Sequence, residues 1–171
     1  MNPTTLKQIA YLTLSDAKML AKKAVNPYHI ANQFPVEWHP GGTHKKEGYL
    51  GAIENVNDEI VLSVYYNPSA IVANFTMATL VSYLLLNPNP KPSIPKGYGL
   101  FIKSNMPAHD NPWLESRTLA TLLLCYSFSP RELKMLNTEG LQLEKNVSKL
   151  AHKKGLPTQF LLSRIAMEFN K

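Results

Sequence analysis

The chain has 171 residues, a hydrophobic fraction of 44% and one cysteine. This apolar content supports one domain with its own core and excludes a largely disordered chain. A single cysteine excludes a disulfide framework and a zinc cluster built on cysteines. The formal net charge of +6 permits an acidic partner, such as nucleic acid or an acidic protein surface, without requiring one.

The first residues lack the basic flank and unbroken apolar stretch of a signal peptide. Residues 60–90 carry no charge, which raises the question of a membrane span, but Asn67 and Pro68 interrupt this stretch. The remaining run, 70–86, is shorter than the roughly 20 residues that a span needs. We therefore expect a buried helix, no membrane contact and a reducing, cytoplasmic setting.

The first third of the chain is predicted to be mainly helical. Ser15 fits the N-cap of a helix over 16–24, and Asn26 followed by proline fits the start of a short helix over 28–33. Residues 36–38 alternate like a brief strand, and a polar loop follows.

The middle of the chain predicts a hairpin followed by a central helix. Strand-like runs cover 49–53 and 60–66, and turn-forming residues lie between them at 55–58. Residues 70–86 are apolar on nearly every face of a helix, so we expect this helix at the centre of the fold. A short strand is predicted within 97–103.

The second half is predicted to be helical after an irregular segment over 87–95, which contains four prolines. A second strongly apolar helix is expected over 113–126. Residues 129–132 combine a serine cap, a proline and an acid, so a helix starts there. The tail, 146–169, is expected to form two helices around a turn at 155–158.

Few residues carry recognisable chemistry. Cys125 lies in an apolar helix, which favours a packing role over a nucleophilic one. No nucleophile elbow, phosphate-binding loop or dinucleotide fingerprint is present. The five histidines are scattered, and no pair has the helical spacing of a zinc peptidase. A site assembled from loops is the remaining enzymatic hypothesis, and its candidate residues are His39, His44, Glu47 and His109.

The tail resembles a helix-turn-helix unit, with a small residue at Ala151 and Gly155 four residues later. Residues 145–171 contain six Lys or Arg and one acid. Two interpretations are open: a helix pair that packs on the core with a solvated basic face, or a surface that contacts phosphates. The candidate contacts for the second are Lys149, Lys153, Lys154 and Arg164.

The central segment 75–86, FTMATLVSYLLL, resembles the helix of ImmA/IrrE metallopeptidases that is usually written FTLAHELGHYLLH. The framing residues match at Phe75, Thr76, Ala78, Leu85 and Leu86. In this register Thr79 stands at the first histidine, Leu80 at the general-base glutamate and Tyr83 at the second histidine.

The resemblance extends along the chain. Residues 48–53 and 60–64 resemble the hairpin that precedes the family's helix, and 119–124 resembles its next helix, which places Trp113 at the third ligand, a glutamate. The tail resembles the closing helix pair. The resemblance implies an α+β, mainly helical zincin-like domain over 1–130 with a small antiparallel sheet, and a helix-turn-helix-like subdomain over 131–171 packed on it.

The same resemblance implies a lost catalytic centre. A hydroxyl and a phenol are poor zinc ligands at neutral pH, a leucine takes no proton from water, and an indole offers a cation no acceptor. We therefore expect a pseudopeptidase without metal or other cofactor. Active relatives are bacterial or phage regulators, so the expected function is a protein-binding regulatory module whose partner is a transcriptional regulator or another host protein. The alternatives are a nucleic-acid-binding regulator and a metal-dependent peptidase with a relocated site.

Overall fold

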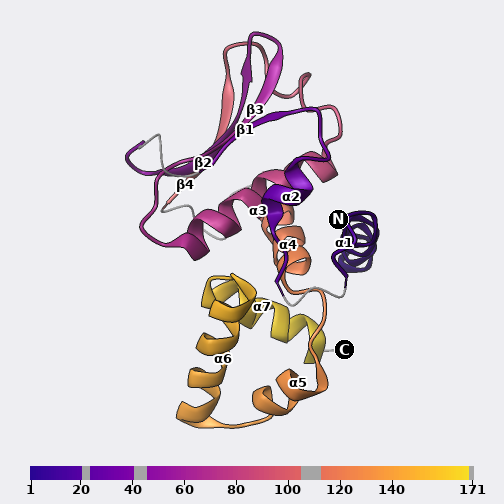
Figure 1. Ribbon diagram of the computed structural model, residues 1–171, viewed down its shortest axis with the longest axis vertical. Helices are drawn as coiled ribbons and strands as arrows, with labels where there is room; N and C mark the ends of the chain where they lie inside the picture. The colour runs from indigo at the N-terminus through magenta and orange to yellow at the C-terminus, as the bar shows by residue number, and fades with distance from the viewer. Residues whose placement is uncertain (21–23, 41–45, 105–112, 170–171) are drawn as a thin grey trace.

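The computed structural model describes residues 1–20, 24–40, 46–104 and 113–169. Within this part the chain forms seven helices and one four-stranded sheet, so the α+β class is confirmed. Figure 1 shows the sheet at one end of the molecule and the last three helices at the other, with the central helix between them. None of the helices in the described ranges has the length and apolarity needed to cross a membrane.

The strands are β1 (Glu37–His39), β2 (Tyr49–Val56), β3 (Glu59–Val64) and β4 (Gly99–Lys103), in the order β1-β3-β2-β4. The predicted hairpin is confirmed, because β2 and β3 pair antiparallel around Asn57 and Asp58, which both have positive φ. β4 also pairs antiparallel with β2.

The prediction of an antiparallel sheet is wrong, because β1 runs parallel to β3 and the sheet is therefore mixed. Alternation along the chain indicates a strand, but it does not say which neighbour the strand joins. β1 passes over its nearest neighbour in sequence, β2, and joins the outer side of the hairpin.

The central helix α3 (Ala70–Leu86) has the predicted bounds. Its N-cap is Ser69, whose side chain accepts a hydrogen bond from the Val72 N–H. The helix packs against β2, where Gly51 permits a close approach: a Cβ atom there would lie 2.7 Å from the carbonyl oxygen of Ser63 and 2.7 Å from Cγ2 of Thr76.

The predicted helix over 16–24 is wrong for residues 17–20 and 24, and residues 21–23 lie outside the described part of the chain. Helix α1 (Pro3–Asp16) ends where that helix was expected to begin, and the chain turns at Lys18, which has a φ of 56°. The N-cap of α1 is Asn2, followed by proline. The same Asn–Pro signal starts α2 (Pro27–Ala31), as predicted.

The second half contains α4 (Trp113–Leu124), α5 (Pro130–Leu136), α6 (Gly140–Lys154) and α7 (Thr158–Phe169). The predicted start of α5 is confirmed by a capping box between Ser129 and Glu132. Helix α6 starts six residues before the position expected from the sequence.

The buried apolar residues form two clusters. The first joins the sheet to α1, α2, α3 and α4. The second joins α5, α6 and α7 to the opposite side of α3 and α4, through Phe75, Ala78, Ala120 and Leu124. The C-terminal helices therefore pack directly on the central helices (Figure 1).

Candidate functional site

The four positions that the predicted resemblance aligns with catalytic residues lie in the core. Thr79, Leu80, Tyr83 and Trp113 are each at most 5% exposed. The hydroxyl of Thr79 donates a hydrogen bond of 2.9 Å to the carbonyl oxygen of Phe75, one turn earlier in α3. The hydroxyl of Thr79 is therefore hydrogen-bonded within its own helix, and Leu80 adds only apolar surface.

Tyr83 and Trp113 form an aromatic pair between α3 and α4. Their ring centroids lie 5.3 Å apart. The indole N–H of Trp113 donates a hydrogen bond of 3.2 Å to the carbonyl oxygen of Phe101 in the edge strand β4. Burial raises the pKa of Tyr83 above its ordinary value of 10, so its phenol is neutral at physiological pH. The two rings pack between α3, α4 and β4.

Within the described ranges there is no cluster of three or more His, Cys, Asp and Glu residues that could hold a metal ion. His39 lies 3.6 Å from the carboxylate of Glu37, and Glu47 is exposed. His44 and His109 lie outside the described residues. The relocated catalytic site thus stays a prediction.

Two adjoining cavities lie along the start of α7, and Thr79 lines the first of them. One, of about 350 Å³, lies between α3, β4 and the start of α7. The other, of about 430 Å³, lies between α4 and α7. They share Arg117, Gln159 and Phe160, and we call them together the α4–α7 groove. Phe160 stacks on Phe75 with a centroid distance of 4.2 Å, so it forms a fixed part of the groove wall.

Among the described residues, the charged ones that line the α4–α7 groove are Lys103 at the end of β4 and Arg117 on α4, and Arg117 is the one that lines both cavities. Apolar side chains surround them, and Leu114 at the rim is 48% exposed. Arg117 and Phe160 are not among the site residues predicted from the sequence. No motif marks them, since helices α4 and α7, which are far apart in sequence, bring them together.

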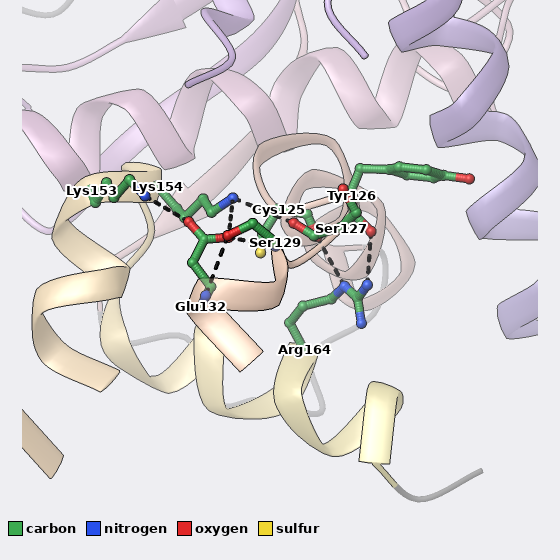
Figure 2. A network of polar contacts seen from close by, with 8 residues as sticks. All are labelled: Cys125, Tyr126, Ser127, Ser129, Glu132, Lys153, Lys154 and Arg164. Carbon is green, nitrogen blue, oxygen red and sulfur yellow. Dashed lines mark hydrogen bonds and ion pairs between the residues drawn. The ribbon is translucent and has the colours of Figure 1, made fainter. Parts of the chain in front are cut away.

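The predicted nucleic-acid contacts belong largely to an internal network (Figure 2). Arg164 is 2% exposed and points into the core. Its guanidinium donates to the carbonyl oxygens of Cys125 and Tyr126, at 2.9 and 2.8 Å, and to the carboxylate of Glu168 at 2.9 Å. Arg164 therefore ties α7 to the C-terminal end of α4.

Glu132 is the acidic centre of this network. Its carboxylate accepts a 2.7 Å hydrogen bond from Lys153, lies 3.4 Å from Nζ of Lys154 and accepts a bond from the Ser129 N–H (Figure 2). Burial alone would raise the pKa of Glu132. The hydrogen bonds from Lys153 and Ser129 and the charges of both lysines outweigh burial and lower this pKa to about 2.

The four predicted contacts do not share one surface. Arg164 is buried and the two lysines pair with Glu132, whereas Lys149 is exposed. The exposed face of α7 bears no basic side chain; it contains Thr158, Gln159, Leu162, Ser163, Ala166, Met167 and Phe169. This arrangement gives the phosphate-binding interpretation little support, and it stays a prediction.

Cys125 packs as expected. Its side chain is 1% exposed, and burial raises the pKa of its thiol to about 11 despite the neighbouring charges of Lys154 and Arg164. A neutral buried thiol is a poor nucleophile.

Comparisons with protein-family models, with curated proteins and with solved structures return no match for this chain. The ImmA/IrrE resemblance therefore depends on the motifs of the sequence and stays a prediction.

Proposed function

We propose that this chain is a non-catalytic, protein-binding regulatory module, an ImmA/IrrE-like pseudopeptidase that works in a cytoplasmic bacterial, phage or mobile-element setting. The observation that carries the proposal is the burial of the former catalytic positions. Thr79 bonds within its own helix, while Tyr83 and Trp113 pack on each other. These side chains offer no strong metal ligand and no base at the positions where the family keeps them.

The α4–α7 groove is the surface that best fits a binding function. It combines an aromatic wall at Phe160 with the positive charge of Arg117. Oppositely charged surfaces attract each other and set the register of a complex. The expected ligand is therefore an acidic segment of a partner protein with an apolar anchor residue, and the proposed source of that segment is a transcriptional regulator or another host protein.

A selection from a library of random peptides tests this function. Wild-type protein is expected to enrich peptides that contain several Asp or Glu residues around an apolar anchor. Arg117→Gln should weaken the enriched peptides about tenfold, because it removes a charge that lines the groove. Fluorescence anisotropy measures the affinity, and binding should weaken as salt is added.

The matched control is Arg131→Gln, which removes the same charge from an exposed position on α5 outside the groove. It should leave affinity unchanged. Equal losses of affinity in both variants would show that the effect comes from net charge, and this result would contradict a ligand bound in the groove. Metal analysis of the purified chain tests the other half of the proposal: stoichiometric zinc together with peptide hydrolysis would overturn it.

A further inference from the structure

Three aromatic side chains gather on the face of the sheet that is turned away from α3. Gly51 faces α3, so its neighbour Ala52 faces the other way. Ala52 pairs with Phe101 on one side and with Ser63 on the other, which places both on this outer face. Tyr65 follows Ser63 by two residues and shares its face. Tyr49 lies before a register irregularity in β2 and pairs with Lys103. Lys103 follows Phe101 by two residues in β4, so both lie on the same face of the sheet.

The three rings, Tyr49, Tyr65 and Phe101, surround one ammonium group, and we call them the ammonium cage. Nζ of Lys46 lies 4.0 Å from the centroid of Phe101, 5.3 Å from that of Tyr49 and 5.8 Å from that of Tyr65. Tyr49 and Phe101 meet edge to face, with centroids 5.4 Å apart. Each ring is within the distance at which a cation is attracted to an aromatic face.

A carboxylate lies beside the ammonium cage. The phenol of Tyr65 donates a hydrogen bond to the carboxylate of Glu54, and the hydroxyl of Ser63 donates one of 3.4 Å to the same carboxylate. Burial, followed by the charge of Glu54, raises the pKa of Tyr65 to about 12, so this phenol stays neutral in the physiological range. The cage thus presents neutral rings with the carboxylate of Glu54 beside them, and both attract a cation, while Lys103 adds one positive charge on the same face of the sheet.

A backbone hydrogen bond holds Lys46, whose ammonium lies in the cage, close to Tyr49. The backbone N–H of Tyr49 donates a 3.1 Å hydrogen bond to the carbonyl oxygen of Lys46, and Gly48 between them has a φ of 78°. Lys46 itself is exposed and has no ion pair with a described residue. Its ammonium is therefore held by rings rather than by a carboxylate.

We propose that the ammonium cage is a binding site for a quaternary ammonium cation of the choline type, which Lys46 occupies when that ligand is absent. A primary ammonium keeps strong hydration, whereas a trimethylated nitrogen is weakly hydrated and spreads its charge over methyl groups that contact rings. The same chemistry is shared by free choline compounds and by the headgroup of a phosphatidylcholine bilayer. The external ligand competes with a tethered lysine, whose effective concentration is on the order of millimolar.

Proton NMR of the full chain tests the proposal with tetramethylammonium as the first probe. In wild-type protein the Lys46 ε-methylene signals should lie upfield because of the ring currents, and the probe should move them toward their ordinary positions. Lys46→Ala, which empties the cage, should bind tetramethylammonium and choline about tenfold more tightly than wild type. Lys91→Ala, which removes another exposed lysine far from the rings, should match wild type.

Two comparisons isolate the cation and the ring. The uncharged isostere of choline, 3,3-dimethyl-1-butanol, should not bind, and Lys46→Ala combined with Phe101→Leu should lose choline binding. Preserved amide spectra confirm that each variant is folded. Absence of saturable binding in folded Lys46→Ala, or equal binding of the uncharged isostere, would overturn the proposal and leave Lys46 as a structural contact.

Two further arms identify the source of the ligand. Soluble phosphocholine and phosphatidylcholine vesicles are offered separately to the Lys46→Ala chain. Binding of phosphocholine alone assigns the site to a soluble molecule, and co-sedimentation with the vesicles that requires Phe101 assigns it to a lipid headgroup. Failure of both arms, with tetramethylammonium and choline also unbound, contradicts the site itself and leaves the α4–α7 groove untouched.

Discussion

Glu132 is a carboxylate that the fold keeps charged although its side chain is only 6% exposed. A buried charge is tolerated only when it is paired and hydrogen-bonded. Lys153 and Lys154 from α6 and the backbone of Ser129 in the turn before α5 supply these contacts. At the residue scale, Lys153 and Lys154, which are candidate phosphate contacts, pair with the carboxylate of Glu132.

The charge of Glu132 should make stability depend on acid. The folded-state pKa of about 2 lies below the ordinary value of 4.5, so folding favours the ionised form. This contribution is complete above about pH 4.5 and is lost as the pH falls from there to about 2. Glu132→Gln should cost about 1–3 kcal/mol at pH 7, because Lys153 and Lys154 lose their partner. Its unfolding free energy should then vary less with pH in that window.

Urea unfolding followed by circular dichroism between pH 2 and 7 measures both effects. Glu144→Gln, at an exposed position on the same C-terminal helices, is the control and should match wild type. A Glu132→Gln chain as stable as wild type at pH 7, with an unchanged acid dependence, would show that the network adds nothing to stability.

At the scale of elements, the end of α4 is held by a side chain from α7. Helices end with carbonyl groups that have no partner inside the helix. Arg164 donates to two carbonyl oxygens just beyond α4, those of Cys125 and Tyr126, and its third contact, Glu168, lies one turn later on α7. The planar guanidinium reaches both carbonyls at once, which an ammonium group could not do with the same geometry.

Arg164→Met should therefore loosen α7 from α4. We expect a loss of about 2–4 kcal/mol, since one buried carbonyl oxygen, one partly buried carbonyl oxygen and one carboxylate lose their donor. Amide hydrogen exchange should accelerate in α7, with Leu161 as a central reporter because it is fully buried. The matched variant Arg131→Met changes an exposed arginine on α5 and should have little effect. Unchanged exchange in α7 would remove Arg164 from this role.

At the scale of the whole molecule, the helices α3 and α4 belong to both apolar clusters. One side of the pair covers the sheet, and the other side receives the C-terminal helices (Figure 1). Residues such as Phe75 and Leu124 would be uncovered if α5, α6 and α7 left. The proposed division into 1–130 and 131–171 thus separates two parts that share one interior surface.

We therefore expect the full chain to unfold in one transition. Fluorescence of Trp38 and Trp113 reports the sheet and the first cluster, whereas far-ultraviolet circular dichroism includes the C-terminal helices. Urea curves from the two probes should coincide, as they do for a cooperative single unit. Loss of helical signal before loss of tryptophan signal would instead establish 131–171 as an independently unfolding subdomain.

Local signals in the sequence determined several elements. Asn26 with its following proline, the serine cap and acid at 129–132, and the uncharged run of α3 each predicted an element where the structure has one. Ser15 fits an N-cap by its residue type, but the first helix begins at the Asn2–Pro3 pair, which carries the same signal as the start of α2. These features depend on neighbours within a few residues, so a single sequence contains them.

Only the tertiary structure decided what the side chains do. The sequence alone shows that no good metal ligand stands at Thr79, Leu80, Tyr83 or Trp113. The burial of these side chains and the packing of the two rings follow only from the contact between α3, α4 and β4. The inward turn of Arg164, the lysines on Glu132 and the rings around Lys46 join residues up to about 55 positions apart. Helix and strand patterns fix which face of an element is apolar, whereas the partner on that face is set by the global packing of elements, which no local pattern encodes.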